Sequence, residues 1–119
     1  MRAVVENLLQ QAIARLQANG IDPKSFVAVD FETFYRTEKT ARKTGTQPVT
    51  VEVQGNWGYC RHPEWEAYMV SIWAPDVQFV GRPEDAPWDK IKGRIWLSHN
   101  RNFDQHVFER LVEQGKIKL

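Results

Sequence analysis

The stretch Phe26-Val27-Ala28-Val29-Asp30-Phe31-Glu32-Thr33 decides the fold prediction. Its first four residues form a short apolar run rich in β-branched side chains, which is typical of a strand buried on both faces. Alternation along a strand places Asp30 and Glu32 on one face and turns Phe31 into the core. Two neighbouring carboxylates repel each other unless a cation lies between them or one is protonated. The acidic pair therefore either holds a hard divalent ion such as Mg²⁺ or Mn²⁺, or simply marks the solvent-exposed end of the strand.

A second polar cluster follows another compact apolar strand, Ile95-Trp96-Leu97. Asn100 and Asp104 lie four residues apart across the expected strand-to-helix junction, so a helical turn would place them on one face. Asp104 falls in the first helical turn, where free N–H groups and the positive end of the helix dipole stabilise a carboxylate. Two interpretations stay open: a functional cluster, or a helix cap at Asn100 with a first-turn acid at Asp104.

The remaining sequence predicts an α/β domain built on a mixed sheet. Residues 3–18 form an amphipathic helix that stops at Asn19-Gly20, and residues 36–48 are polar and basic, which indicates an exposed loop. Further strands are expected at 49–53, 67–73 and 77–80, a loop or short helix at 83–90, and a helix from 102 to 115. This order predicts helices packed on a mixed sheet, with strand 95–97 parallel to a neighbour.

Composition limits the function classes. The 119 residues are enough for one domain, and 16 Lys and Arg against 15 Asp and Glu leave a net charge of +1. That balance argues against binding nucleic acid through bulk positive charge. The single cysteine, Cys60, forms neither an internal disulfide nor a zinc cluster by itself, which favours a cytoplasmic protein. No apolar run approaches the roughly 20 residues that span a bilayer, so we expect no membrane partner.

Taken together, the two polar stretches resemble the DEDD superfamily of 3′–5′ exonucleases. Residues 26–33 are similar to its first motif. The stretch Ser98-His99-Asn100-Arg101-Asn102-Phe103-Asp104 is similar to the second, in which an Asn is followed three and four residues later by an aromatic residue and an Asp. Residues 59–64, between the motifs, resemble the proofreading domains of phage-type family A DNA polymerases. The resemblance spans roughly residues 26–114, and two motifs in the expected structural context are more specific than either one.

The resemblance implies a ribonuclease-H-like mixed β-sheet flanked by helices, with the first-motif strand central. It implies that Asp30, Glu32 and Asp104 are catalytic and bind two divalent ions, Mg²⁺ or Mn²⁺. Asp30 and Glu32 would hold the tightly bound ion and Asp104 would serve the second. The reaction would be hydrolysis of phosphodiester bonds at single-stranded DNA 3′ ends. The candidate nucleic-acid-binding residues are Thr33, Asn100 and Phe103 by resemblance, and Arg36 as a backbone contact unless its basic stretch is simply solvated.

The family pattern also requires a fourth carboxylate, in a third motif with a Tyr or His a few residues before it. Glu109 and Glu113 follow Asp104 on the same expected helix, and neither has a Tyr or His in the required setting. We therefore expect residues 1–20 to form an N-terminal amphipathic helix and residues 21–119 a partial domain, truncated before its last strand and helices. Three explanations stay open: a second polypeptide or a homo-oligomer completes the fold, the chain is an inactive nucleic-acid-binding or assembly module, or another residue replaces the missing ligand.

Overall fold

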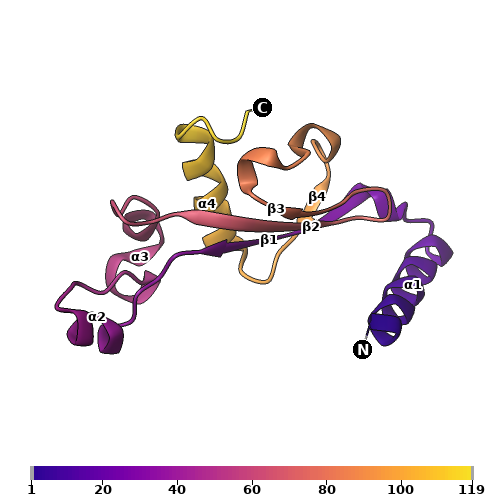
Figure 1. Cartoon of the computed structure of the whole chain (residues 1–119). Coiled ribbons are helices and arrows are strands. Elements are labelled where there is room, and N and C mark those ends of the chain that lie inside the picture. The colour runs from indigo at the N-terminus through magenta and orange to yellow at the C-terminus, as the bar shows by residue number, and fades with distance from the viewer. Residues whose placement is uncertain (1, 119) are drawn as a thin grey trace.

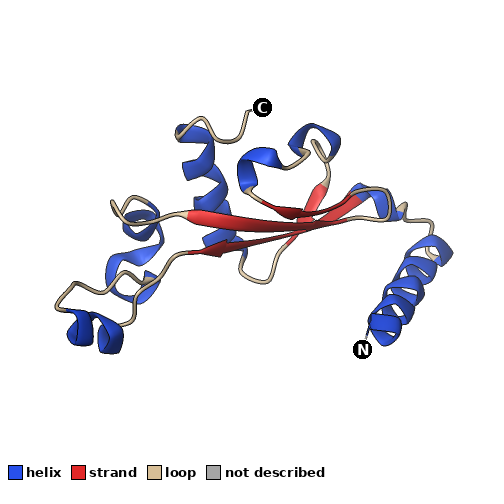
Figure 2. Cartoon of the chain, in the orientation of Figure 1, coloured by secondary structure: helices blue, strands red, loops and turns tan. Residues whose placement is uncertain are grey.

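The chain folds around a four-stranded mixed β-sheet. The computed structural model describes residues 2–118, and its strands lie in the order β3-β2-β1-β4 (Figures 1 and 2). The strands are β1 (Phe26–Thr33), β2 (Ala67–Trp73), β3 (Gln78–Gly81) and β4 (Ile95–Leu97). β1 pairs with β2 antiparallel and with β4 parallel, so the strand that carries the acidic pair is interior. The predicted mixed α/β sheet, including the parallel strand 95–97, is confirmed.

Four helices join or flank these strands. They are α1 (Arg2–Ala18), α2 (Glu38–Thr44), α3 (Val51–Cys60) and α4 (Arg101–Glu113), and single 3₁₀ turns lie at Pro23–Ser25, Pro83–Asp85 and Trp88–Lys90. The predicted helices at 3–18 and 102–115 and the short helical turns at 83–90 are confirmed. The described helices include none that is long and apolar enough to cross a membrane.

The core lies on one face of the sheet. Val27, Val29 and Phe31 project from β1 to this face and are at most 4% exposed. α4 packs there through Val107 and Leu111, both fully buried, and Figure 1 shows α4 and the 3₁₀ turns at Pro83–Asp85 and Trp88–Lys90 on this side of the sheet. Burial of these apolar side chains supplies the main driving force for the fold.

The opposite face of the sheet is open. Ala28, Asp30 and Glu32 project from β1 to this face and are exposed. Within residues 2–118 no helix runs along this face, and only one end of α1 approaches it (Figure 1). The prediction that the apolar run of β1 is buried on both faces is therefore wrong, because its Ala28 side is not covered.

Two predictions between β1 and β2 are also wrong. Residues 36–48 were expected to form a loop but contain α2, which begins where the Thr37 side chain accepts a hydrogen bond from the Thr40 N–H at 3.2 Å and ends at Gly45 with φ 69°. An N-cap hydroxyl and a left-handed C-terminal glycine are common helix boundaries. We call residues 34–66, which contain α2 and α3, the 34–66 lobe.

The strand expected at 49–53 is mostly helix. Only Val49 makes a strand-like contact, an isolated antiparallel bridge to Arg36. The Thr50 side chain then caps α3 by accepting a hydrogen bond from the Val53 N–H. The helix is interrupted at Gly55, whose φ of 74° lies in the left-handed region. The turn expected at Gly55-Asn56 is therefore present as a kink within α3.

α1 stands apart from the rest of the chain. It lies beyond the start of β1 (Figure 1), and Val4, Val5 and Leu8 on its apolar stripe are 52–62% exposed. The chain measures 55 × 34 × 21 Å with a radius of gyration of 16.9 Å. A compact chain of this length has a radius of gyration of about 13–14 Å. The separate helix and the lobe at the other end therefore make the chain elongated.

Candidate metal and nucleic-acid site

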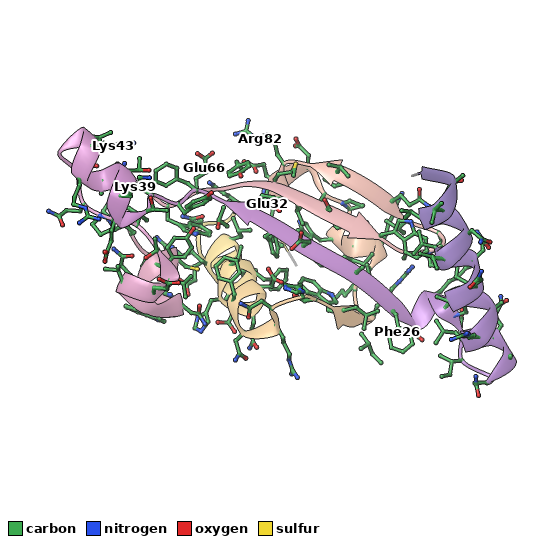
Figure 3. The ribbon with its side chains drawn as sticks, turned by 90° about the horizontal axis from the view of Figure 1, so that it is seen from below. Phe26, Glu32, Lys39, Lys43, Glu66 and Arg82 are labelled. Carbon is green, nitrogen blue, oxygen red and sulfur yellow. The ribbon has the colours of Figure 1, made fainter. Side chains whose placement is uncertain are left out.

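The acidic pair lies on the open face at the C-terminal half of β1. Asp30 is opposite Ser71 and Glu32 is opposite Met69 on β2. Figure 3 shows Glu32 near the end of β1 that is far from Phe26. A shallow hollow of about 440 Å³ lies beside Asp30 and is lined in part by Ser71 and Ser98. Asp30 is therefore accessible to a ligand from the open side.

Asp104 approaches the same strand from the first turn of α4. Its side chain is only 3% exposed, and the Ser98 hydroxyl donates a hydrogen bond to Asp104 Oδ2. Burial raises the pKa of Asp104, and the nearby charge of Asp30 raises it further. Hydrogen bonds from the Ser98 hydroxyl and the Phe31 backbone N–H act in the opposite direction on this pKa. Asp104 and Asp30 therefore lie close enough to repel each other, which is the situation that a cation between them would relieve.

The short pairing of β4 explains this approach. β4 pairs with only the first three residues of β1, from Phe26 to Ala28. Beyond Leu97 the chain turns through Ser98 into α4, so the start of α4 lies beside the part of β1 that β4 leaves unpaired. The Phe31 backbone lies near the Asp104 carboxylate at this edge and acts to lower the Asp104 pKa. Sequence reasoning assigned no role to Ser98, although its position directly after a strand and before a capped helix was a usable signal.

Asn100 is used by the helix. Its side-chain oxygen accepts a hydrogen bond from the Phe103 N–H at 3.3 Å, which makes it the N-cap of α4. This is the capping interpretation that the sequence left open. Phe103 itself is partly buried and tilts against the Tyr59 ring, with the ring centroids 5.9 Å apart.

Phe103 lines a second hollow, and Thr33 contacts Tyr59, which lines the same hollow. Thr33 Oγ1 lies 2.8 Å from Tyr59 Oη, and the Tyr59 hydroxyl donates to the Phe34 carbonyl oxygen. Burial raises the pKa of Tyr59, so its hydroxyl stays protonated at neutral pH. Tyr59 and Phe103 help to line a hollow of about 570 Å³ between α2, α3 and α4, which also includes Tyr35 and Lys39. No individual role was assigned to Tyr59 from the sequence, since its contact with Thr33 spans 26 positions.

Arg36 connects separate parts of the 34–66 lobe by hydrogen bonds. Its guanidinium donates to both carboxylate oxygens of Glu64, at 2.7 and 3.0 Å, and to the Gln47 carbonyl oxygen at 3.0 Å. The Arg36 hydrogen bonds hold the pKa of Glu64 below its ordinary value. Because these partners occupy its guanidinium, a contact between Arg36 and nucleic acid would require breaking this arrangement. Lys39 and Lys43 lie on α2, toward the end of the molecule beyond Glu66 (Figure 3).

The predicted metal ligands do not form a closed set. Within residues 2–118, no group of three or more His, Cys, Asp and Glu side chains is arranged to hold a metal ion. The donors nevertheless suit a hard cation, because carboxylate oxygens are the preferred ligands of Mg²⁺ and Mn²⁺. The charge of Asp30 acts on Asp104, and Glu32 projects to the same face as Asp30.

The fold and the site together define a mixed α/β domain with the Asp30 and Asp104 carboxylates near each other at the junction of β1 and α4. Comparisons of the chain with protein-family models, with curated proteins and with solved structures gave no match.

Proposed function

We propose that the chain carries the first- and second-motif part of a metal-dependent 3′–5′ exonuclease of the ribonuclease-H-like kind, as in phage-type DNA polymerases. Its ligand would be the 3′ end of single-stranded DNA. The observation that supports this most is the proximity of Asp104 on α4 to Asp30 on the interior strand β1. Asp30 belongs to the first motif and Asp104 to the second, and the two motifs could share a metal ion only if these carboxylates lie near each other.

The carboxylates would hold the divalent ion, Mg²⁺ or Mn²⁺. Such an ion, when bound, lowers the pKa of a water molecule and stabilises the charge that develops on the phosphate oxygens. Asp30 and Asp104 would be its main ligands in this chain, with Glu32 beside them. Ser98 and the Phe31 N–H would orient the Asp104 carboxylate by their hydrogen bonds. Loading with a cation would also favour the ionised form of Asp104, which burial disfavours.

The hollow beside Thr33 would receive the last nucleotides of the strand. Phe103 supplies a partly exposed aromatic ring there, backed by the buried ring of Tyr59, and stacking on aromatic side chains binds bases with little sequence preference. The protonated Tyr59 hydroxyl and the Thr33 hydroxyl are polar groups at the same place. Lys39 provides a positive charge for a phosphate in this hollow, which the carboxylates of Glu38 and Glu52 also line.

A second candidate function is a binding or assembly module without turnover. The described residues supply no fourth carboxylate with a Tyr or His before it in the required setting, and no closed group of three ligands. Under the first proposal, the fourth ligand would come from another segment or from a second polypeptide. Under the second, metal and DNA binding would persist without hydrolysis.

One experiment separates these possibilities. Mn²⁺ binding is followed by the loss of the electron paramagnetic resonance signal of free Mn²⁺, and a 5′-labelled single-stranded DNA is then incubated with the loaded protein. We expect Asp30→Asn and Asp104→Asn each to weaken Mn²⁺ binding by about tenfold or more, a loss of roughly 1.4 kcal/mol. Asp85→Asn, an exposed carboxylate on a distant 3₁₀ turn, is the matched control and should bind as the wild type does.

The DNA product decides between the two candidates. Stepwise shortening from the 3′ end that is absent in Asp30→Asn supports the exonuclease. Mn²⁺-dependent DNA binding without shortening supports the binding module. Mn²⁺ binding that is the same in the wild type and all three variants would refute the site itself.

A further inference from the structure

One half of the open sheet face is apolar. Ile95 and Leu97 on β4 are 57% and 53% exposed. The strand registers place Leu97 beside Ala28, and Ala28 beside Trp73 on β2. We call this surface the apolar patch; it consists of Ala28, Trp73, Ile95 and Leu97. The patch lies at the Phe26 end of β1, whereas Asp30 and Glu32 lie toward the other end.

α1 carries a matching apolar stripe that is only half covered. Leu9, Ile13 and Leu16, nearer its C-terminal end, are partly buried and line a narrow cavity of about 190 Å³ against Trp73 and Leu97 of the apolar patch. The stripe continues toward the N-terminus through Val4, Val5 and Leu8, which are exposed. The contact between α1 and the apolar patch therefore starts within the chain and stops part-way along both surfaces.

We propose that two copies of this chain associate by exchanging α1, so that the N-terminal half of each α1 lies across the apolar patch of the other copy. A helix and a sheet face that complement each other on one chain generate a closed, two-fold symmetric pair.

The exposed apolar side chains supply much of the area that such a pair needs. Five side chains are more than half exposed on the two surfaces: Val4, Val5, Leu8, Ile95 and Leu97. Counted over two copies they present on the order of 1,000 Å² of apolar surface, and stable interfaces bury about 1,200 Å² or more in total. The patch residues that are already partly covered, such as Trp73, would add to this area. Exchange would also cover the exposed apolar side chains of α1.

The connection of α1 to the sheet suits this exchange. The helix ends at Gly20, whose φ of 73° is a left-handed C-terminal position, and a short segment then leads to the 3₁₀ turn at Pro23–Ser25. A terminal helix joined by a short hinge exchanges between copies at low cost. Asp30 borders the same hollow as Ala28, Trp73 and Leu97 of the apolar patch, so the exchanged helix would lie beside the acidic pair.

Sedimentation velocity of the full chain tests the proposal over a roughly hundredfold range of micromolar concentrations, since the populations of a dimer depend on concentration. We expect a dimer for the wild type and a monomer for both Leu8→Lys and Leu97→Lys. Val53→Lys is the matched control, because Val53 is an equally exposed apolar residue on α3, and this variant should remain dimeric. A wild type that stays monomeric throughout, or a dimer that survives both substitutions, would overturn the proposal.

Cross-linking identifies the surfaces that meet. Chains carrying Leu8→Cys and chains carrying Leu97→Cys, with different affinity tags, are mixed and treated with a short bismaleimide. Buried Cys60, 1% exposed, does not compete. The exchange predicts that cross-links between the two kinds of chain predominate. Cross-links that form mainly between two Leu8→Cys chains would instead show helix-to-helix pairing and refute the exchange.

Discussion

The hydroxyl of Tyr59 joins the 34–66 lobe to the end of β1, and its removal tests that role directly. The side chain is 2% exposed, contacts Thr33 Oγ1 at 2.8 Å and donates to the Phe34 carbonyl oxygen. Tyr59→Phe keeps the ring and its contact with Phe103 but leaves two partly buried polar groups without this partner. We expect the variant to fold with the same architecture and to be less stable.

The expected loss follows from the two partners. A buried polar group that loses its hydrogen-bond partner costs about 1–3 kcal/mol, and the partial burial of Thr33 and Phe34 places each of them at the low end. The free energy of unfolding should therefore fall by about 2 kcal/mol. With an entropy of unfolding of about 2.1 cal/mol/K per residue, this loss corresponds to a decrease in Tm of about 8 °C.

Urea unfolding followed by circular dichroism, together with a thermal scan, measures this loss. Tyr35→Phe is the control, because Tyr35 is 66% exposed and belongs to the same lobe. Its free energy of unfolding should change by less than about 0.5 kcal/mol. If Tyr59→Phe is destabilised no more than Tyr35→Phe, the Tyr59 hydroxyl does not hold the lobe to β1, and the argument fails.

Three further outcomes are expected. Burial raises the folded-state pKa of Asp104, so the contribution of Asp104 to stability is present below the ordinary pKa of 3.8 and is lost as the pH rises through the folded-state pKa. The urea midpoint of the wild type should therefore fall above about pH 4 relative to that of Asp104→Asn. Parallel pH profiles of the two proteins would contradict this. Two hydrogen bonds from Arg94, 2.7 and 2.6 Å long, lower the pKa of Asp76 to about 2. The contribution of Asp76 to stability is therefore full above pH 3.8 and is lost as the pH falls through 2. The stability difference between the wild type and Asp76→Asn should shrink over that interval, and a constant difference would refute the role of this ion pair. Burial raises the pKa of Cys60 to about 11, so Ellman's reagent should react slowly with the folded chain at pH 8 and quickly in urea. A fast reaction without urea would show that the thiol is accessible.

The sheet was predictable because its strands carry local signals. β2 has the predicted bounds, Ala67–Trp73, and β3 follows the Pro75-Asp76 turn as expected. Asp104 was placed in a first helical turn from the strand-to-helix pattern, and the structure has it there. Its burial and its electrostatic contact with Asp30 required the strand order, which no local pattern provides.

The 34–66 lobe was not predictable in the same way. α2 and α3 are short, and isolated helices of this length are marginal in water. They are fixed by contacts between distant positions, such as the pairing of Arg36 with Glu64 and of Thr33 with Tyr59. The uncovered Ala28 side of β1 was missed for a related reason: an apolar run shows that a strand suits burial, but not that anything covers it.

The way in which residues 34–66 are attached has a consequence for engineering. The Phe34 N–H donates to the Glu66 carbonyl oxygen at 2.8 Å, directly beyond the pairing of Thr33 with Ala67. The lobe is thus inserted at the tip of a hairpin whose two strands are already adjacent. A turn of two to five residues, the usual length in hairpins, would join β1 to β2 in its place. The lobe also packs on α4, through Tyr59 against Phe103 and through the Arg61–Glu113 ion pair, so such a turn would have to be combined with substitutions that cover the exposed side of α4.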